Sequence, residues 1–174
     1  LQPAQLDYFS QPRSGFITEI AADSRLGRDD LLQIAYSYYD AVDLNDGGLA
    51  PFADDCLRRE NGWQTSSTTE ADAEPDAVTV FSMMGCAEQL DTNVMQYIDV
   101  IDNRRIHIAD PQTGLVFGLS HFRHSMTQPA NPIVGVEGVE VRNMTNGPFD
   151  LPAAHIFKIG TDGQLHEIEA TGVL

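Results

Sequence analysis

Apolar positions recur at three- and four-residue spacing across residues 28–43, which is the period of an amphipathic helix. Two acidic residues, Asp29 and Asp30, stand in the first turn of this segment, where the helix dipole favours negative charge. The pattern predicts a long helix that ends in the turn residues 45–48, followed by a short second helix over residues 49–54. The apolar positions of the long helix are Leu31, Leu32, Ile34, Ala35, Tyr38, Ala41 and Val42.

The second half of the chain is dominated by runs in which apolar and polar residues alternate, the period of a half-buried strand. Residues 78–94 are ambiguous between the two periods, with apolar positions that suit a packed helix. Helices followed by antiparallel strands indicate an α+β fold. Strands are predicted over residues 56–60, 97–109, 115–124, 151–159 and 164–171.

The length of 174 residues fits a single domain, here residues 1–174. Three segments lack the periodicity of the predicted elements. They are an N-terminal arm or short extra helix over residues 1–26, a polar insertion over 64–78, and a second insertion over 126–150 with room for one strand.

Charge excludes several classes of partner. The chain has 10 Lys and Arg against 26 Asp and Glu, a net charge of −16, whereas nucleic acids and anionic membrane surfaces recruit basic clusters. The sequence has no apolar run of the roughly 20 residues that span a bilayer. We therefore expect no nucleic acid and no membrane as partners.

The two cysteines, Cys56 and Cys86, leave two possibilities open, a pair of buried thiols or one disulfide. The single glycosylation sequon, Asn143-Met144-Thr145, fits a secreted protein. The sequence is compatible with a cytoplasmic or a secreted soluble protein, so localisation stays open.

The chain carries none of the common glycine-rich or nucleophile motifs, GxGxxG, GxxxxGK[ST] or GxSxG. His121 and His124 are three residues apart, which in a strand directs them to opposite faces. We therefore predict no cofactor and no metal site.

Three segments resemble the nuclear-transport-factor-2-like (NTF2-like) superfamily, which includes ketosteroid isomerase, scytalone dehydratase and the SnoaL-like polyketide cyclases. Residues 36–46 (YSYYDAVDLND) are similar to the end of the family's first helix, and residues 49–55 (LAPFADD) to the element that leads into its first strand. Residues 156–169 resemble its closing hairpin. The resemblance implies a cone-shaped, curved antiparallel sheet wrapped around a long N-terminal helix, and a homodimer.

The resemblance also implies a catalytic set inside an apolar pocket, so the expected partner is a small apolar molecule. In ketosteroid isomerase a general base works opposite an oxyanion hole made of a Tyr and a protonated Asp. An ungapped alignment on residues 52–55 places Tyr36 at that Tyr and Glu60 at the base. His155 falls where the protonated Asp stands, which is a departure that puts steroid isomerisation in doubt. The expected catalytic residues are thus Glu60, Tyr36 and His155.

Strand alternation and the resemblance suggest which side chains surround them. His155 shares a strand face with Phe157, and His121 shares one with Phe117. The expected pocket residues are His121, Trp63, Phe117, Phe157 and Tyr39. Several of the expected catalytic and pocket residues also have a purely structural interpretation. Tyr36, His121 and His155 can be core residues, and Glu60 can form a surface ion pair with Arg58 or Arg59.

The predicted function is a cofactor-independent lyase, dehydratase or isomerase that abstracts a proton from an aromatic, terpenoid or polyketide-like substrate. The alternative is a non-catalytic ligand-binding or dimerisation module of the same fold. A third possibility is an epoxide-opening hydrolase, which needs an arginine between two carboxylates. Arg105 and Arg123 are available for it, but no spacing selects either.

Overall fold

The computed structural model describes residues 10–67 and 80–172 and contains one large sheet, a long helix and several short elements. The helical elements are α2 (Ser14–Ile17), η1 (Ala22–Ser24), α3 (Arg28–Leu44), η2 (Gly47–Leu49), η3 (Val80–Met83) and α4 (Cys86–Asp91). The strands are β1 (Phe52–Glu60), β2 (Trp63–Ser66), β3 (Val100–Asp110), β4 (Leu115–His124), β5 (Ala130–Pro132), β6 (Val141–Asn143), β7 (Phe149–Ile159) and β8 (Leu165–Gly172). No helix in these two ranges is long and apolar enough to cross a membrane.

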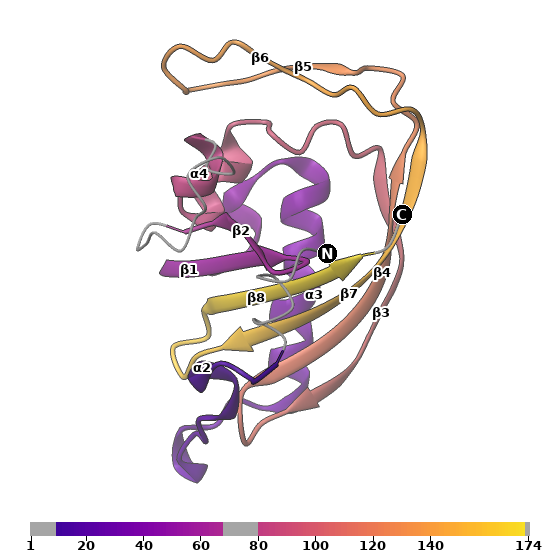
Figure 1. Cartoon of the computed structure of the whole chain (residues 1–174). Helices are drawn as coiled ribbons and strands as arrows, with labels where there is room; N and C mark the ends of the chain where they lie inside the picture. The colour runs from indigo at the N-terminus through magenta and orange to yellow at the C-terminus, as the bar shows by residue number, and fades with distance from the viewer. Residues whose placement is uncertain (1–9, 68–79, 173–174) are drawn as a thin grey trace.

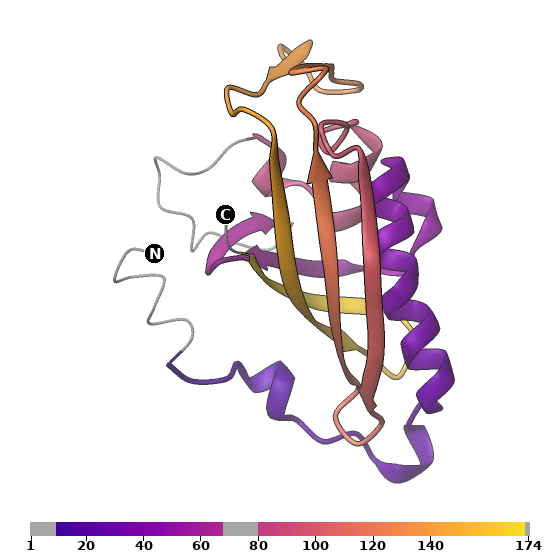
Figure 2. The same cartoon turned by 90° about the vertical axis from the view of Figure 1, so that its right-hand side faces the viewer.

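Six strands form the main sheet in the order β2-β1-β8-β7-β4-β3. The sheet curves across α3, which packs against β3, β4 and β7 (Figures 1 and 2). This confirms the predicted α+β fold. One pairing was not anticipated, because β1 runs parallel to β8 while the other neighbours are antiparallel. The sheet is therefore mixed.

The helix α3 forms as the apolar pattern predicts, and it buries one stripe against the sheet. Its C-terminus is closed by Asn45, which adopts the left-handed conformation with φ 50°. The Asn45 side-chain oxygen also accepts a hydrogen bond from the backbone N–H of Met95, 2.9 Å away, and so ties the helix end to the segment before β3. The buried stripe consists of Leu31, Ala35, Tyr38, Tyr39, Ala41 and Val42.

Side-chain alternation divides each long strand into an inner face towards α3 and an outer face. Along β4 the residues from Val116 to His124 are buried at every second position, and those between them are only partly buried. On β7 the inner face includes Ala153, His155 and Phe157. Whether a side chain reaches the interior therefore depends on one residue of register.

Several local predictions need correction. The second helix expected over 49–54 is only the short η2 before β1 begins at Phe52, and the ambiguous 78–94 region contains η3 and α4. Part of the 64–78 insertion is the strand β2, and residues 68–79 lie outside the described residues. The 126–150 insertion holds two strands, β5 and β6, which form a separate ribbon beyond the end of the main sheet (Figure 1).

Of the two possibilities left open for the cysteines, the structure shows the disulfide: Cys56 on β1 is bonded to Cys86 at the start of α4. Both cysteines belong to the buried core. The bond fixes α4 over the inner face of β1.

Candidate functional site

Two adjoining hollows lie between α3, the inner face of the sheet and α4. The inner hollow has a volume of about 70 Å³ and is lined by side chains of α3, β1, β4, β7 and β8. The outer hollow is wider, about 440 Å³, and is lined by β1, β2, η3, α4 and β6. Arg58, Glu60, Met95 and Tyr97 line both hollows, so the two communicate at these four residues.

Arg58 is a charged side chain with only 1% of its surface exposed. Its Nε lies 3.2 Å from Glu60 Oε1 and 3.1 Å from Thr65 Oγ1, and its Nη2 donates to the side-chain oxygen of Gln89. Burial alone would lower the pKa of Arg58, but the influence of Tyr38 and Glu60 raises it above its usual value. Arg58 is therefore a fixed positive charge in the wall of both hollows.

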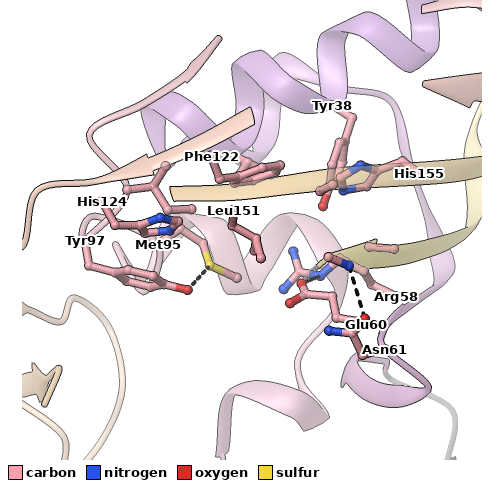
Figure 3. A pocket seen from close by; sticks show the side chains of 15 residues that line it. Tyr38, Arg58, Glu60, Asn61, Met95, Tyr97, Phe122, His124, Leu151 and His155 are labelled. Carbon is pink, nitrogen blue, oxygen red and sulfur yellow. Dashed lines mark hydrogen bonds and ion pairs between the residues drawn. The ribbon is translucent and has the colours of Figure 1, made fainter. Parts of the chain in front are cut away.

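Glu60 is the carboxylate partner of Arg58, and 44% of its side chain remains exposed. Strand alternation explains its position, since Cys56, Arg58 and Glu60 occupy the same face of β1. The carboxylate is held by Arg58 on one side and open to the hollows on the other (Figure 3). A carboxylate in this position can accept a proton from a bound molecule.

Tyr38 lines the inner hollow from α3 and is almost completely buried. Burial raises the pKa of Tyr38 to about 12, and nearby Arg58 only partly opposes this shift. The hydroxyl therefore stays protonated and can donate a hydrogen bond to an oxygen that becomes negatively charged.

His155 lines the same hollow from β7, with 2% of its surface exposed. Its ring stacks on Phe157 with centroids 5.7 Å apart and meets Tyr38 at 5.6 Å. Burial, with a smaller contribution from Arg58, lowers the pKa of His155 to about 3. Its Nδ1 has no hydrogen-bond partner among the described residues. The imidazole is thus neutral near pH 7, with one N–H donor and one acceptor.

A second group of polar side chains, Tyr97 and His124, lines the end of the inner hollow that lies away from Tyr38 and His155 (Figure 3). The Tyr97 ring stacks on His124 at 5.5 Å, and the Tyr97 hydroxyl donates to Met95 Sδ, 3.7 Å away. In Figure 3, Phe122 and Leu151 lie between this group and the Tyr38–His155 pair. The hollow therefore has two polar ends and an apolar middle.

The structure brings together two of the three expected catalytic residues, Glu60 and His155, with Tyr38 beside them. Tyr36 does not join them, because it is 46% exposed and lies against Arg104, outside both hollows. Tyr36 and Tyr38 are two positions apart on α3, which turns them to different sides of the helix.

The expected pocket residues are divided among three places. Trp63 lines the outer hollow. Tyr39 and Phe157 are fully buried in the core, where both rings pack against His155. Phe117 and His121 do not line either hollow, because they occupy the outer face of β4 while Phe122 and His124 occupy the inner one. The residues of β4 alternate as predicted, but the interior face is the one that carries Phe122 and His124.

Sequence reasoning missed Arg58, Tyr38, Tyr97 and Arg142. For two of them a signal existed: Tyr38 belongs to the apolar stripe of the first helix, and Arg58 shares a strand face with Cys56 and Glu60. Nothing in the local pattern could place Arg142, which reaches the outer hollow from the β5–β6 ribbon. Within residues 10–67 and 80–172, no three His, Cys, Asp or Glu side chains are grouped to hold a metal ion.

Comparisons with known proteins agree with this architecture. A family model described as "Domain of unknown function (DUF8021)" matches residues 24–172. No curated protein matches the chain.

Several solved structures share the fold at low sequence identity. A candidate polyketide cyclase from Silicibacter sp. TM1040 is 14% identical, with a TM-score of 0.52 over 86% of this chain and 93% of that one. AclR, a candidate hydroxylase from Streptomyces galilaeus, is 9% identical, with a TM-score of 0.51 over 84% and 91%. The epoxide hydrolase/cyclase-like enzyme SalBIII is 12% identical, with a TM-score of 0.50 over 84% and 92%. The NTF2-like, SnoaL-like fold expected from the resemblance is confirmed.

Proposed function

This chain belongs to the family described as "Domain of unknown function (DUF8021)", and from its site we propose a small-molecule enzyme of the lyase or isomerase kind. It would act by abstracting a proton from a mostly apolar substrate, with Glu60 as the general base. The names of its structural neighbours, a candidate polyketide cyclase and an epoxide hydrolase/cyclase-like enzyme, support small-molecule chemistry in this fold.

One observation carries the proposal. A carboxylate, a protonated phenol and a neutral imidazole, from Glu60, Tyr38 and His155, line one small and otherwise largely apolar hollow. These are the group types that a proton abstraction needs: a base, and donors for the oxygen on which negative charge develops.

The chemistry follows from the protonation states. Glu60 takes a proton from a carbon next to a substrate carbonyl, and the electron pair of the broken C–H bond moves onto the carbonyl oxygen. The Tyr38 O–H and the His155 N–H donate to that oxygen, with Arg58 as a nearby positive charge. Returning the proton to another atom completes an isomerisation, whereas delivering it to a departing hydroxyl group completes a dehydration.

His155 takes part only as a neutral group in this scheme. With a pKa of about 3 it does not become protonated near neutral pH, so a proton-shuttle role is disfavoured. The donor role remains, because a neutral imidazole keeps one N–H.

The sizes of the two hollows suggest how a substrate lies. Small-molecule sites commonly measure roughly 300–1,000 Å³. The inner hollow, at about 70 Å³, holds only the reacting end of a substrate, while the outer hollow, at about 440 Å³, holds the body. Glu60 stands where the two meet.

A second candidate is a non-catalytic ligand-binding module, and the narrow inner hollow is the observation that favours it. Epoxide opening has less support. Arg123 does lie between two carboxylates, 3.1 Å from Asp102 and 2.9 Å from Asp150, but it is on the outer face of β4, away from both hollows.

The test is solvent-deuterium uptake, followed by mass spectrometry, on a pool of aryl, terpenoid and polyketide-like ketones and alcohols. We expect the protein to accelerate deuterium uptake or loss of water for at least one member of the pool, without any added cofactor. Heat-denatured protein serves as the control. Binding of pool members with no exchange and no mass change would favour the non-catalytic module.

A further inference from the structure

The outer hollow is lined by a second arginine, Arg142, that the proposed proton transfer does not use. Arg58 and Arg142 both line it, against the single carboxylate of Glu60. Glu60 is already paired with Arg58, so within residues 10–67 and 80–172 the lining of this hollow offers no further carboxylate to Arg142. A cationic position in the mouth of a cavity is notable in a chain with a net charge of −16.

The contacts of Arg142 hold its side chain in place without neutralising it. Its guanidinium carbon lies 4.8 Å from the centroid of the Tyr97 ring, and its Nη1 donates to the backbone oxygen of Val94 at 2.8 Å. No Asp or Glu in residues 10–67 and 80–172 forms an ion pair with it. A guanidinium has five N–H donors; in the part of the chain that the structure describes, those of Arg142 serve the Val94 backbone oxygen and the Tyr97 hydroxyl oxygen, which leaves donors for a further acceptor.

Tyr97 supplies a second donor at the same place. Burial raises the pKa of Tyr97, with Arg142 opposing the shift and Glu60 adding to it, so its hydroxyl carries a proton. Among the described residues, that hydroxyl donates to the Met95 thioether, 3.7 Å away, and a thioether sulfur is a weak acceptor. A carboxylate oxygen would be a much stronger acceptor for it.

We propose that Arg142 and Tyr97 form an anion subsite and that the substrate is a small apolar carboxylic acid. Its carboxylate lies at Arg142, and its apolar body lies along Phe81, Val94 and Met95. The reacting carbon then points towards Glu60 and the inner hollow. The inference rests on the proposed function, since it describes the substrate of the same site.

Trp63 provides the readout, because it is the only tryptophan of the chain and lines the outer hollow. Cyclohexylacetate and its neutral amide, cyclohexylacetamide, are suitable probes, since neither absorbs where tryptophan does. A charge-assisted hydrogen bond contributes roughly 1.5–3 kcal/mol, so we expect the acid to bind wild type about 10- to 100-fold more tightly than the amide.

Substitution of Arg142 sharpens the test. Arg142→Gln should weaken binding of the acid about 10-fold or more and leave amide binding unchanged, and Arg142→Lys should keep part of the preference. Arg105→Gln, which removes an exposed arginine of β3, is the matched control and should change nothing. Equal affinities for acid and amide, an acid affinity insensitive to Arg142→Gln, or no binding of either probe would each overturn the subsite.

The binding test of the anion subsite and the turnover test of the proton-transfer function can fail independently of each other. Acid-selective binding without any turnover of acidic substrates would retain the subsite and contradict the proton-transfer function. Turnover of neutral ketones with no acid preference would retain the function and overturn the subsite.

An independent observation concerns the other side of the same ribbon. Asn143 follows Arg142 on β6, so their side chains point to opposite faces, and Asn143 and Thr145 are both exposed. They form the single sequon of the chain, Asn143-Met144-Thr145. The Cys56–Cys86 disulfide fits the oxidising secretory pathway in which such sites are modified.

We infer that Asn143 is an N-glycosylation site. The Asn143 amide nitrogen bonds to the anomeric carbon of a lipid-diphosphate-linked oligosaccharide, the bond from that carbon to the diphosphate breaks, and the amide gives up one proton. Because Asn143 faces away from the hollow, the glycan leaves the substrate's entrance open.

The test is secretion of the full chain from a eukaryotic host, followed by peptide N-glycosidase F and peptide mass spectrometry. We expect a mass loss on treatment and conversion of Asn143 to aspartate. Thr145→Ser, which keeps the sequon, should remain modified, and Asn143→Gln should not. Secreted wild-type protein with the mass of the unmodified chain would overturn the assignment.

Discussion

A Glu60→Gln protein is expected to process the substrate about 100- to 10,000-fold more slowly than wild type, the range for loss of a general base. The amide has nearly the shape of the carboxylate, so it keeps the packing around Arg58, but it cannot accept the substrate proton. Substrate affinity should change much less than the rate. The measurement is initial-rate kinetics, or deuterium uptake, on the compound found by the substrate screen.

A lower rate of Glu60→Gln could come from loss of the base or from partial unfolding, and the control must distinguish these two causes. Glu60→Gln leaves the buried Arg58 without a carboxylate partner, although its hydrogen bonds to Gln89 and Thr65 remain. Rates are therefore compared at a temperature where circular dichroism shows both proteins folded. Glu88→Gln removes an exposed carboxylate of the neighbouring α4 and should leave the rate unchanged. Unimpaired turnover by Glu60→Gln would exclude Glu60 as the base.

Removal of the disulfide should have the largest effect on stability. For Cys56→Ala/Cys86→Ala, loss of a link between residues 30 apart in sequence is expected to cost about 3–4 kcal/mol of unfolding free energy. In a domain of this size that lowers the melting temperature by roughly 10 °C. Differential scanning calorimetry of the oxidised wild type and the double variant measures the difference.

Reduction of the wild type provides a second comparison. Reduced wild-type protein should melt close to the double variant, because both lack the link between β1 and α4. Identical melting temperatures for oxidised protein, reduced protein and the double variant would mean that the link does not stabilise the fold.

Much of the fold could be predicted from local pattern. The helix over 28–43 and the strands over 115–124 and 151–159 lie within two residues of α3, β4 and β7, because each buries one face and so repeats its apolar positions regularly. The elements η3, α4, β5 and β6 have only three to six residues each, so the spacing of their apolar residues is too short a pattern to indicate a helix or a strand. The parallel pairing of β1 with β8 joins distant segments, so no local pattern indicates it.

The candidate site was predicted less completely than the fold. Glu60 and His155 follow from family resemblance and strand alternation, which fix a residue's position along its element. Alternation separates two faces of a strand but does not say which one is inside, and for this reason Phe117 and His121 were misplaced. In the same way, an alignment gives Tyr36 a position along the helix but not the direction of its side chain, and Tyr38 is the tyrosine that lines the inner hollow.

By itself the sequence determined the α+β class, the long helix, the side-chain alternation of the main strands and the acidic character that disfavours nucleic acid. These properties depend on local periodicity and on total charge, both of which are present in the unfolded chain. Only the tertiary structure decided that Arg58 is buried beside Glu60 and that Cys56 bonds to Cys86. It alone also places Arg142 in the outer hollow with Arg58, although Arg142 belongs to a ribbon more than 80 residues further along the chain. The physical reason is that pairing, burial and shifts in pKa depend on which distant side chains meet, and the packing of helix and sheet decides that.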